Sequence, residues 1–129
     1  MTAAEPGLNV EFDGPAKSEA VGRPVVVLHG FTGSTTTMWP MARTLADVRR
    51  VVAIDLPGHG RSPGPPCATI EDMADTVIAA IDALGREEAT LVGHSMGALV
   101  ALEAAPRASH RVSRLALLGG GVPMRVSPA

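Results

Sequence analysis

The chain has 129 residues, of which 46% are hydrophobic and 19% charged, and its formal net charge is −2 with a pI near 6.0. This length and composition predict one globular domain with one core, and exclude a disordered or modular protein. The weakly acidic balance provides no basic surface, so we expect neither nucleic acid nor a membrane as a partner. Neither a leader pattern nor a run of ~20 apolar residues is found, which predicts a soluble, cytoplasmic protein.

The first half of the chain alternates strand patterns with a helical one. Residues 8–12 alternate apolar and polar side chains and predict an antiparallel edge strand, whereas the β-branched runs at residues 23–30 and 50–55 predict buried parallel strands. Between these runs a helix is expected, with Pro40 tolerated in its first turn. Its apolar face consists of Met38, Met41, Leu45 and Val48. The prolines of residues 61–67 predict a loop, and Cys67 within it has no second cysteine to pair with.

The second half continues the same alternation. A helix with a regular apolar stripe should begin after a capping Thr69, carry Asp72 near its positive end and stop at Gly85. The stripe consists of Ile70, Met73, Ala74, Val77, Ile78, Ile81 and Leu84. Strands are predicted at residues 89–93 and 112–118, with a further helix starting directly after Ser95. The order predicts an α/β fold whose parallel sheet binds ligands beyond the carboxyl ends of its strands.

Residues 93–97, Gly-His-Ser-Met-Gly, match the G-x-S-x-G pattern between an apolar strand and a helix of small residues. Such a turn lifts the Ser95 hydroxyl above the sheet, and glycines flank it because side chains there would collide with the neighbouring strand or helix. The helix start directs free amides at the same place. We therefore predict Ser95 as a nucleophile, with the backbone amides of Met96 and Phe31 as the oxyanion hole.

Three segments resemble the α/β-hydrolase fold family, in particular its esterase, perhydrolase and carbon–carbon-bond hydrolase branch. They are His-Gly-Phe-Thr-Gly-Ser at residues 29–34, Asp-Leu-Pro-Gly-His-Gly-Arg-Ser at residues 55–62, and residues 93–97. The resemblance spans about residues 24–121 and implies a small-molecule acyl substrate, such as an ester or thioester, with no metal or organic cofactor. The same segments, with Trp39, also resemble the SHCHC-synthase-like lyases. Haloalkane dehalogenases are similar too, but they carry Asp where this chain has Ser95.

The resemblance also suggests which residues surround the substrate. We assign His29, Gly30, Trp39 and His94 to substrate binding. For the imidazoles of His29 and His94, a structural role is favoured over base catalysis, and His94 should project away from Ser95 because neighbouring side chains diverge at a sharp turn. Asp55 is predicted to be a turn carboxylate that accepts backbone amides rather than a triad acid.

The triad partners of Ser95 are predicted to be missing. In this family the acid and the histidine follow the serine in the chain, and only Glu103 and His110 satisfy that order. Glu103 should lie about two turns into its helix, and His110 roughly 20 Å from Ser95, at 1.5 Å per residue. The sequence therefore predicts the N-terminal portion of one domain, over residues 1–129, that lacks the cap, the last strands and the last helices. Without these partners, we expect kcat to be lower by a factor on the order of 10⁶.

Two alternatives remain open at this stage. In the first alternative, the chain is a non-catalytic remnant or one half of a split protein. The free edge of the strand at residues 112–118 would then favour self-association or binding of a partner chain. A nucleotide-binding α/β module is the weaker alternative because no G-x-G-x-x-G pattern and no phosphate-loop lysine follow any strand.

Overall fold

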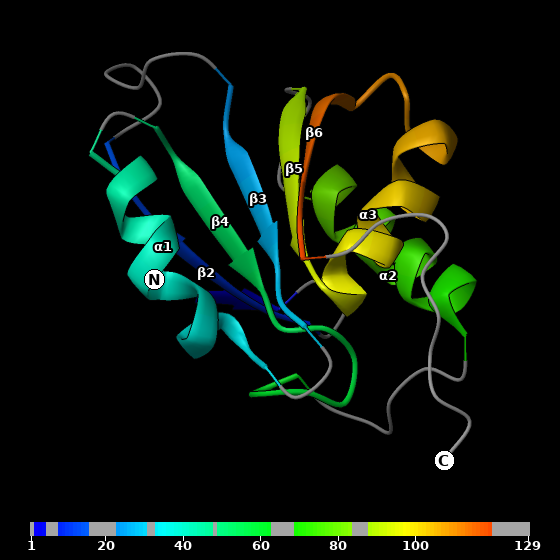
Figure 1. Cartoon of the computed structure of the whole chain (residues 1–129), viewed down its shortest axis with the longest axis horizontal. Helices are drawn as coiled ribbons and strands as arrows, with labels where there is room; N and C mark the ends of the chain where they lie inside the picture. The colour runs from blue at the N-terminus through cyan, green and yellow to red at the C-terminus, as the bar shows by residue number, and fades with distance from the viewer. Residues whose placement is uncertain are drawn as a thin grey trace.

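In the described part of the chain, six strands form one sheet that helices cover on both faces (Figure 1). The computed structural model describes residues 2–4, 8–15, 23–30, 33–47, 49–62, 69–83 and 88–119. The strands are β1 (Thr2–Ala4), β2 (Asn9–Asp13), β3 (Val25–Leu28), β4 (Val51–Ile54), β5 (Ala89–His94) and β6 (Val112–Leu118). The helices are α1 (Thr35–Leu45), α2 (Ile70–Ala83) and α3 (Met96–Arg107). The expected α/β class and the crossover helices are thereby confirmed.

The strand order β1-β2-β4-β3-β5-β6 places the parallel strands at the centre of the sheet. β3 pairs in parallel with β4 and with β5, and β5 pairs in parallel with β6. β2 runs antiparallel to β4, as its alternating pattern predicts. The carboxyl ends of β3, β4 and β5 therefore lie at one edge of the layer, where ligands of such sheets bind.

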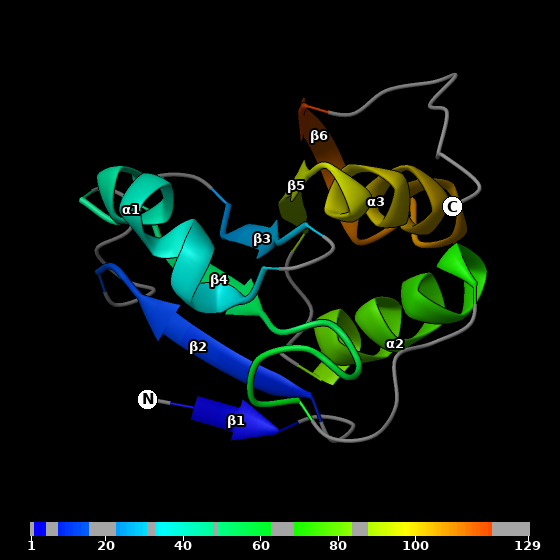
Figure 2. The same ribbon diagram turned by 60° about the horizontal axis from the view of Figure 1, so that its bottom comes forward.

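The prediction that residues 8–12 form an edge strand is wrong. β1 pairs antiparallel with β2 on its outer side, with Ala3 opposite Val10, so β1 is the outermost strand (Figure 2). Alternation of apolar and polar side chains shows that one face of a strand meets a more polar surrounding. It does not show whether a further strand occupies the strand's free edge.

Pro40 also lies elsewhere than predicted. α1 begins at Thr35, so Pro40 is its sixth residue and stands beyond the first turn. Ser34 caps the helix: its side chain accepts the Thr36 N–H at 3.2 Å, and Thr37 completes a reciprocal capping box. This polar run starts the helix ahead of the apolar stripe, and the exposed proline is tolerated because the carbonyl left without a donor lies toward solvent.

The starts of α2 and α3 follow the sequence prediction. Thr69 Oγ1 accepts the Asp72 N–H at 3.0 Å, which confirms Thr69 as a cap, and α3 starts directly after Ser95. Several residues used in the predictions lie outside the described residues: Phe31, Val48, Cys67, Leu84 and Gly85. None of the described helices is both long and apolar enough to span a membrane.

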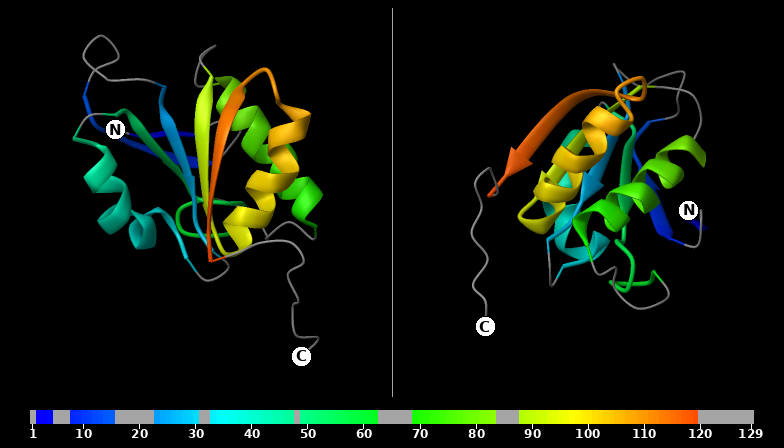
Figure 3. Two further views of the ribbon diagram at one scale, coloured as in Figure 1. Left: turned by 45° about the horizontal axis from the view of Figure 1, so that its top comes forward. Right: turned by 90° about the vertical axis from the view of Figure 1, so that its right-hand side faces the viewer.

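Each face of the sheet has its own apolar core. Val26, Leu28 and Leu91 point to the side of α2 and α3, whereas Val25, Val27 and Val92 point to the side of α1. β6 lies at the opposite edge from β1, and no described strand pairs with its outer side (Figure 3). The predicted free edge of this strand is therefore confirmed within the described residues. Two leucines of β6, Leu115 and Leu118, are 38% and 39% exposed.

The Asp55 carboxylate joins three segments at the carboxyl end of β4. It accepts the Thr35 N–H at 2.6 Å, the Arg61 N–H at 3.0 Å and the Asn9 side-chain amide at 2.9 Å. Its side chain is buried, with 1% exposure. Ser62 donates to the Asp55 carbonyl oxygen and accepts the Asn9 N–H. The predicted structural role of Asp55 is therefore confirmed: it ties the start of α1 and the turn after β4 to β2.

Replacing Asp55 tests this role. Asp55→Asn keeps the size of the side chain but turns an amide NH₂ toward other N–H donors, and we expect the free energy of unfolding to fall by about 2–4 kcal/mol. Urea denaturation measures this. Asp13→Asn is the matched control because Asp13 is exposed and its carboxylate accepts only the adjacent Gly14 N–H among the described residues. Equal stability of the two variants would contradict the role of Asp55.

Candidate active site

Ser95 occupies a strained turn between β5 and α3. Its φ is 56° and its ψ is −114°, and it is the only non-glycine residue with positive φ in the described part of the chain. A backbone of this kind is costly for a residue with a side chain and persists only where the surroundings enforce it. The Ser95 side chain does not cap α3, so the hydroxyl is not used by the helix.

Two glycines make the turn sterically feasible. A Cβ at Gly93 would lie 2.3 Å from the Gly97 carbonyl oxygen, and a Cβ at Gly97 would lie 2.4 Å from the carbonyl oxygen of Leu28. The contacts of both are backbone atoms, which cannot move aside as a flexible side chain can. β3, β5 and α3 therefore approach each other more closely than any larger residue allows.

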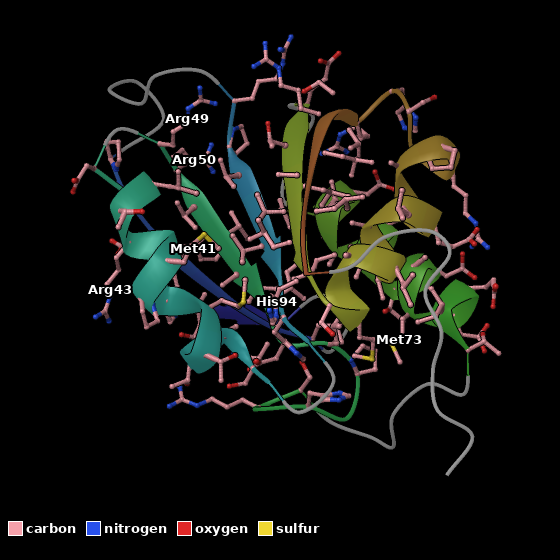
Figure 4. All side chains as sticks on the ribbon, viewed as in Figure 1. Met41, Arg43, Arg49, Arg50, Met73 and His94 are labelled. Carbon is pink, nitrogen blue, oxygen red and sulfur yellow. The ribbon has the colours of Figure 1, made fainter. Side chains whose placement is uncertain are left out.

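Ser95 lines a cavity of about 580 Å³ at the carboxyl ends of the central strands. The cavity lies between the first turns of α1, the loop after β3 and the end of β6. Its lining residues are Gly30, Gly33, Thr37, Met38, Met41, His94, Ser95 and Leu118. Figure 4 shows His94 at the end of β5 and Met41 projecting from α1 toward the sheet. The cavity thus combines a serine, an imidazole and apolar side chains.

His94 does not project away from Ser95 as the sequence suggested. A Cβ at Gly30 would lie 3.3 Å from both His94 Nδ1 and Ser95 Cβ, so the two side chains border the same small space. Side chains alternate sides in a regular strand, but the positive φ of Ser95 ends that alternation. As a result the structure brings Gly30, His94 and Ser95 together.

His29 belongs to the core rather than to the cavity. Its ring is fully buried, Nε2 accepts the Leu56 N–H at 2.9 Å, and Nδ1 therefore carries the proton donated to the Gly30 carbonyl oxygen at 2.7 Å. Burial, aided by the neighbouring His59, lowers the pKa of His29 and keeps the ring neutral. With both nitrogens used, the imidazole shapes the loop after β3 and has no atom left for a substrate.

Trp39 is likewise directed away from the cavity. Its indole N–H donates to Glu11 Oε1 at 3.1 Å, and the same carboxylate accepts the Thr35 hydroxyl at 2.9 Å. Burial acts to raise the pKa of Glu11, but hydrogen bonds from Asn9, Trp39 and Thr35 outweigh it and hold the pKa below its usual value. Sequence reasoning missed Glu11, because a charged residue within an alternating strand looks like an ordinary solvent-facing position.

The two residues that satisfy the triad order do not line the cavity. Glu103 pairs with Arg107 at 2.9 Å on the outer surface of α3, and His110 is exposed beyond the end of that helix. Met96, the first residue of α3, has one of the amides that a helix leaves without an intrahelical acceptor. Phe31, the other predicted donor, lies outside the described residues; in the sequence it stands between Gly30 and Gly33, which line the cavity. Within the described residues no cluster of His, Cys, Asp and Glu could hold a metal ion.

Comparison with known proteins places this geometry in a family. Residues 23–129 match the model of the alpha/beta hydrolase fold. The chain belongs to the alpha/beta hydrolase fold family.

Several known proteins resemble this chain over most of its length. It is 41% identical over 98 residues to the dihydrolipoyllysine-residue acetyltransferase component of the acetoin cleaving system of Pseudomonas putida, covering 75% of the chain and 26% of that protein. It is 31% identical over 100 residues to the esterase YbfF of Escherichia coli (strain K12), covering 78% and 39%. A solved structure of an N-acyl homoserine lactone degrading enzyme has a TM-score of 0.76 at 30% identity, covering 94% and 46%. The chain thus spans less than half the length of each of these relatives.

The close approach at Gly97 gives a stability test of the turn. We expect Gly97→Ala to lower the free energy of unfolding by about 1–3 kcal/mol or more, because the new methyl group would meet backbone oxygens of β3 and the loop after it. Gly30→Ala is the control, since its Cβ would meet no atom closer than 3.3 Å, and the nearest atoms belong to the side chains of His94 and Ser95. Chemical denaturation that finds Gly97→Ala no less stable than Gly30→Ala would contradict the close packing of α3 against β3.

Proposed function

We propose that Ser95 is the nucleophile of a site that hydrolyses a small acyl compound, such as an ester or thioester. The observation that carries the proposal is the positive φ of Ser95 at the end of β5, combined with a hydroxyl that lines a cavity. Strain of this kind at a half-buried serine costs stability and persists only where the surrounding structure enforces it. The esterase among the relatives supports the same reaction class.

The oxyanion would form at the start of α3. We assign Met96 as one donor because its amide has no intrahelical acceptor and belongs to the positive end of the helix dipole. Phe31 is assigned as the second donor, supported by the two residues near it in the loop, Gly30 and Gly33, which border the cavity. Each such donor contributes roughly 10²–10³ in rate when it faces the developing charge.

The remaining walls favour an apolar acyl group. Met38 and Met41 on α1 and Leu118 at the end of β6 surround the serine on the side away from α3. Methionine side chains adapt to irregular apolar shapes, so they suit a hydrocarbon chain better than a charged one. Thr37 adds a hydroxyl to the wall, while the imidazole of His94 lies beside Ser95.

We further propose that the described chain alone turns over slowly. Within the described residues, no imidazole is held by a carboxylate beside Ser95: His29 is buried in backbone hydrogen bonds, and neither His110 nor Glu103 lines the cavity. A serine hydroxyl without a base is a weak nucleophile at neutral pH.

Fluorophosphonate labelling with and without added imidazole tests both parts of the proposal. We expect slow labelling of the chain alone, acceleration by imidazole acting as an external base, and no labelling of Ser95→Ala. Ser109→Ala, which alters an exposed serine that does not line the cavity, should label like the wild type. Fast labelling without imidazole would disprove the impairment, whereas labelling that persists in Ser95→Ala would disprove the nucleophile.

The free edge of β6 favours a second candidate function, binding of a partner chain. β6 has unpaired backbone groups on its outer side within the described residues, and Leu115 and Leu118 are among its exposed side chains. An exposed apolar strand edge is a template for pairing with another strand. In this alternative the chain is a binding module, or one half of a split protein, and Ser95 has no catalytic use.

Sedimentation velocity over a range of concentrations tests the second candidate. If β6 pairs with another copy, we expect a concentration-dependent dimer that Leu115→Lys weakens, because a charge at an exposed strand edge opposes pairing. Ser109→Lys, at an exposed position before β6, carries the same change of charge and should leave the dimer intact. A cooperatively folded monomer at every concentration would argue against any need for a partner.

A further inference from the structure

A second cavity lies at the opposite end of the sheet from Ser95. Its volume is about 340 Å³, and its lining residues are Arg23, Arg49, Thr90, Ser113 and Arg114. Figure 4 shows Arg49 near the start of β4, at the other end of the sheet from His94. Thr90 and Ser95 are five residues apart along β5, which corresponds to about 16 Å. The second cavity is therefore separate from the proposed acyl site.

The strand order assembles this cavity from four segments. Arg49 precedes β4, Arg23 precedes β3, Thr90 lies in β5, and Ser113 and Arg114 lie in β6. These strands are neighbours in the sheet and run parallel, with Val25 opposite Thr90 and Thr90 opposite Arg114. Residues far apart in the sequence thus meet in one row at the amino ends of the strands. A row built on paired strands is a rigid surface for a ligand.

The cavity holds more positive charge than its surroundings neutralise. Arg23 pairs with Glu88 at 3.1 Å, but both side chains are about half exposed, with 52% and 43% exposure, and such pairs are weak. The one side-chain hydrogen bond of Arg49 in the described part of the chain is to the Arg23 carbonyl oxygen, at 3.4 Å. Among the described residues, no carboxylate pairs with Arg49 or Arg114. Three guanidinium groups therefore face one described carboxylate, in a chain whose overall charge is negative.

The polar groups in the cavity suit a phosphate-bearing ligand. Guanidinium groups bind phosphate oxygens through paired N–H donors, and hydroxyls add further donors at the same short range. Thr90 is half-buried, and its hydroxyl has no hydrogen-bond partner within the described residues. Within the same residues, Ser113 Oγ makes one long contact, 3.4 Å, to the Ala89 carbonyl oxygen. Both hydroxyls are thus available beside the arginines.

We propose that this cavity is a binding site for a small molecule carrying one or more phosphate groups. Arg49 and Arg114 clamp the phosphate from opposite sides, Arg23 contributes once its exposed pair with Glu88 opens, and Thr90 and Ser113 donate from the floor. The site lies away from Ser95, so its occupation is independent of acyl chemistry.

Titration calorimetry with pyrophosphate at low ionic strength tests the site. We expect saturable binding that Arg49→Gln and Arg114→Gln each weaken roughly tenfold, the effect of losing one charge-assisted contact. Arg43→Gln makes the same change of net charge at an exposed position on α1 and should weaken binding less than twofold. Ser95→Ala should bind like the wild type. In the wild-type protein, pyrophosphate should shift the backbone amide resonances of Thr90 and Ser113.

Several outcomes would overturn the proposal. An absence of saturable binding would do so, as would an equal loss in Arg43→Gln and Arg114→Gln, which would show attraction by net charge alone. Shifts confined to amides away from Thr90 and Ser113 would place the ligand elsewhere, a result that does not depend on whether any variant folds. Co-sedimentation with phosphatidic acid vesicles, without binding of free pyrophosphate, would indicate a lipid headgroup instead of a small molecule.

Discussion

The close contact between β3, β5 and α3 is the constraint on which the rest of the site depends. Gly93 and Gly97 allow backbone to lie against backbone, and Ser95 between them has a positive φ. The strain is sustained by a parallel sheet buried on both faces, with α3 docked on one of them. Packing energy spread over the core therefore holds one serine above the end of the sheet.

A buried polar network fixes the opposite wall of the cavity. Asp55 binds the start of α1 and the turn after β4, while His29 joins the loop after β3 to Leu56. Glu11 adds the side chains of Thr35 and Trp39 to the same assembly. Because α1 carries Met38 and Met41 into the cavity, these buried hydrogen bonds determine where its apolar wall lies. Asp55 and His29, whose side chains are of types found in catalytic sites, thus serve to position the residues that line the cavity.

The two ends of the sheet differ in chemistry. The carboxyl ends gather Ser95, His94 and apolar side chains, whereas the amino ends gather arginines and hydroxyls. Both cavities include β6, the strand whose outer edge is free in the described part of the chain. Anything that pairs with β6 would therefore border both sites, through Leu118 at one end and Arg114 at the other.

The sequence alone determined the class of fold, the place of the strained turn and the structural role of Asp55. These follow from local rules: apolar periodicity, the fixed spacing of glycines around Ser95, and the turn chemistry after β4. Only the tertiary structure decided that β1 pairs with the outer edge of β2. It also decided that His29 and Trp39 face away from the cavity and that His94 lies beside Ser95. It alone also brought Arg49 and Arg114 together. Where a side chain points, and which distant strand becomes its neighbour, depends on packing between segments that no local pattern encodes.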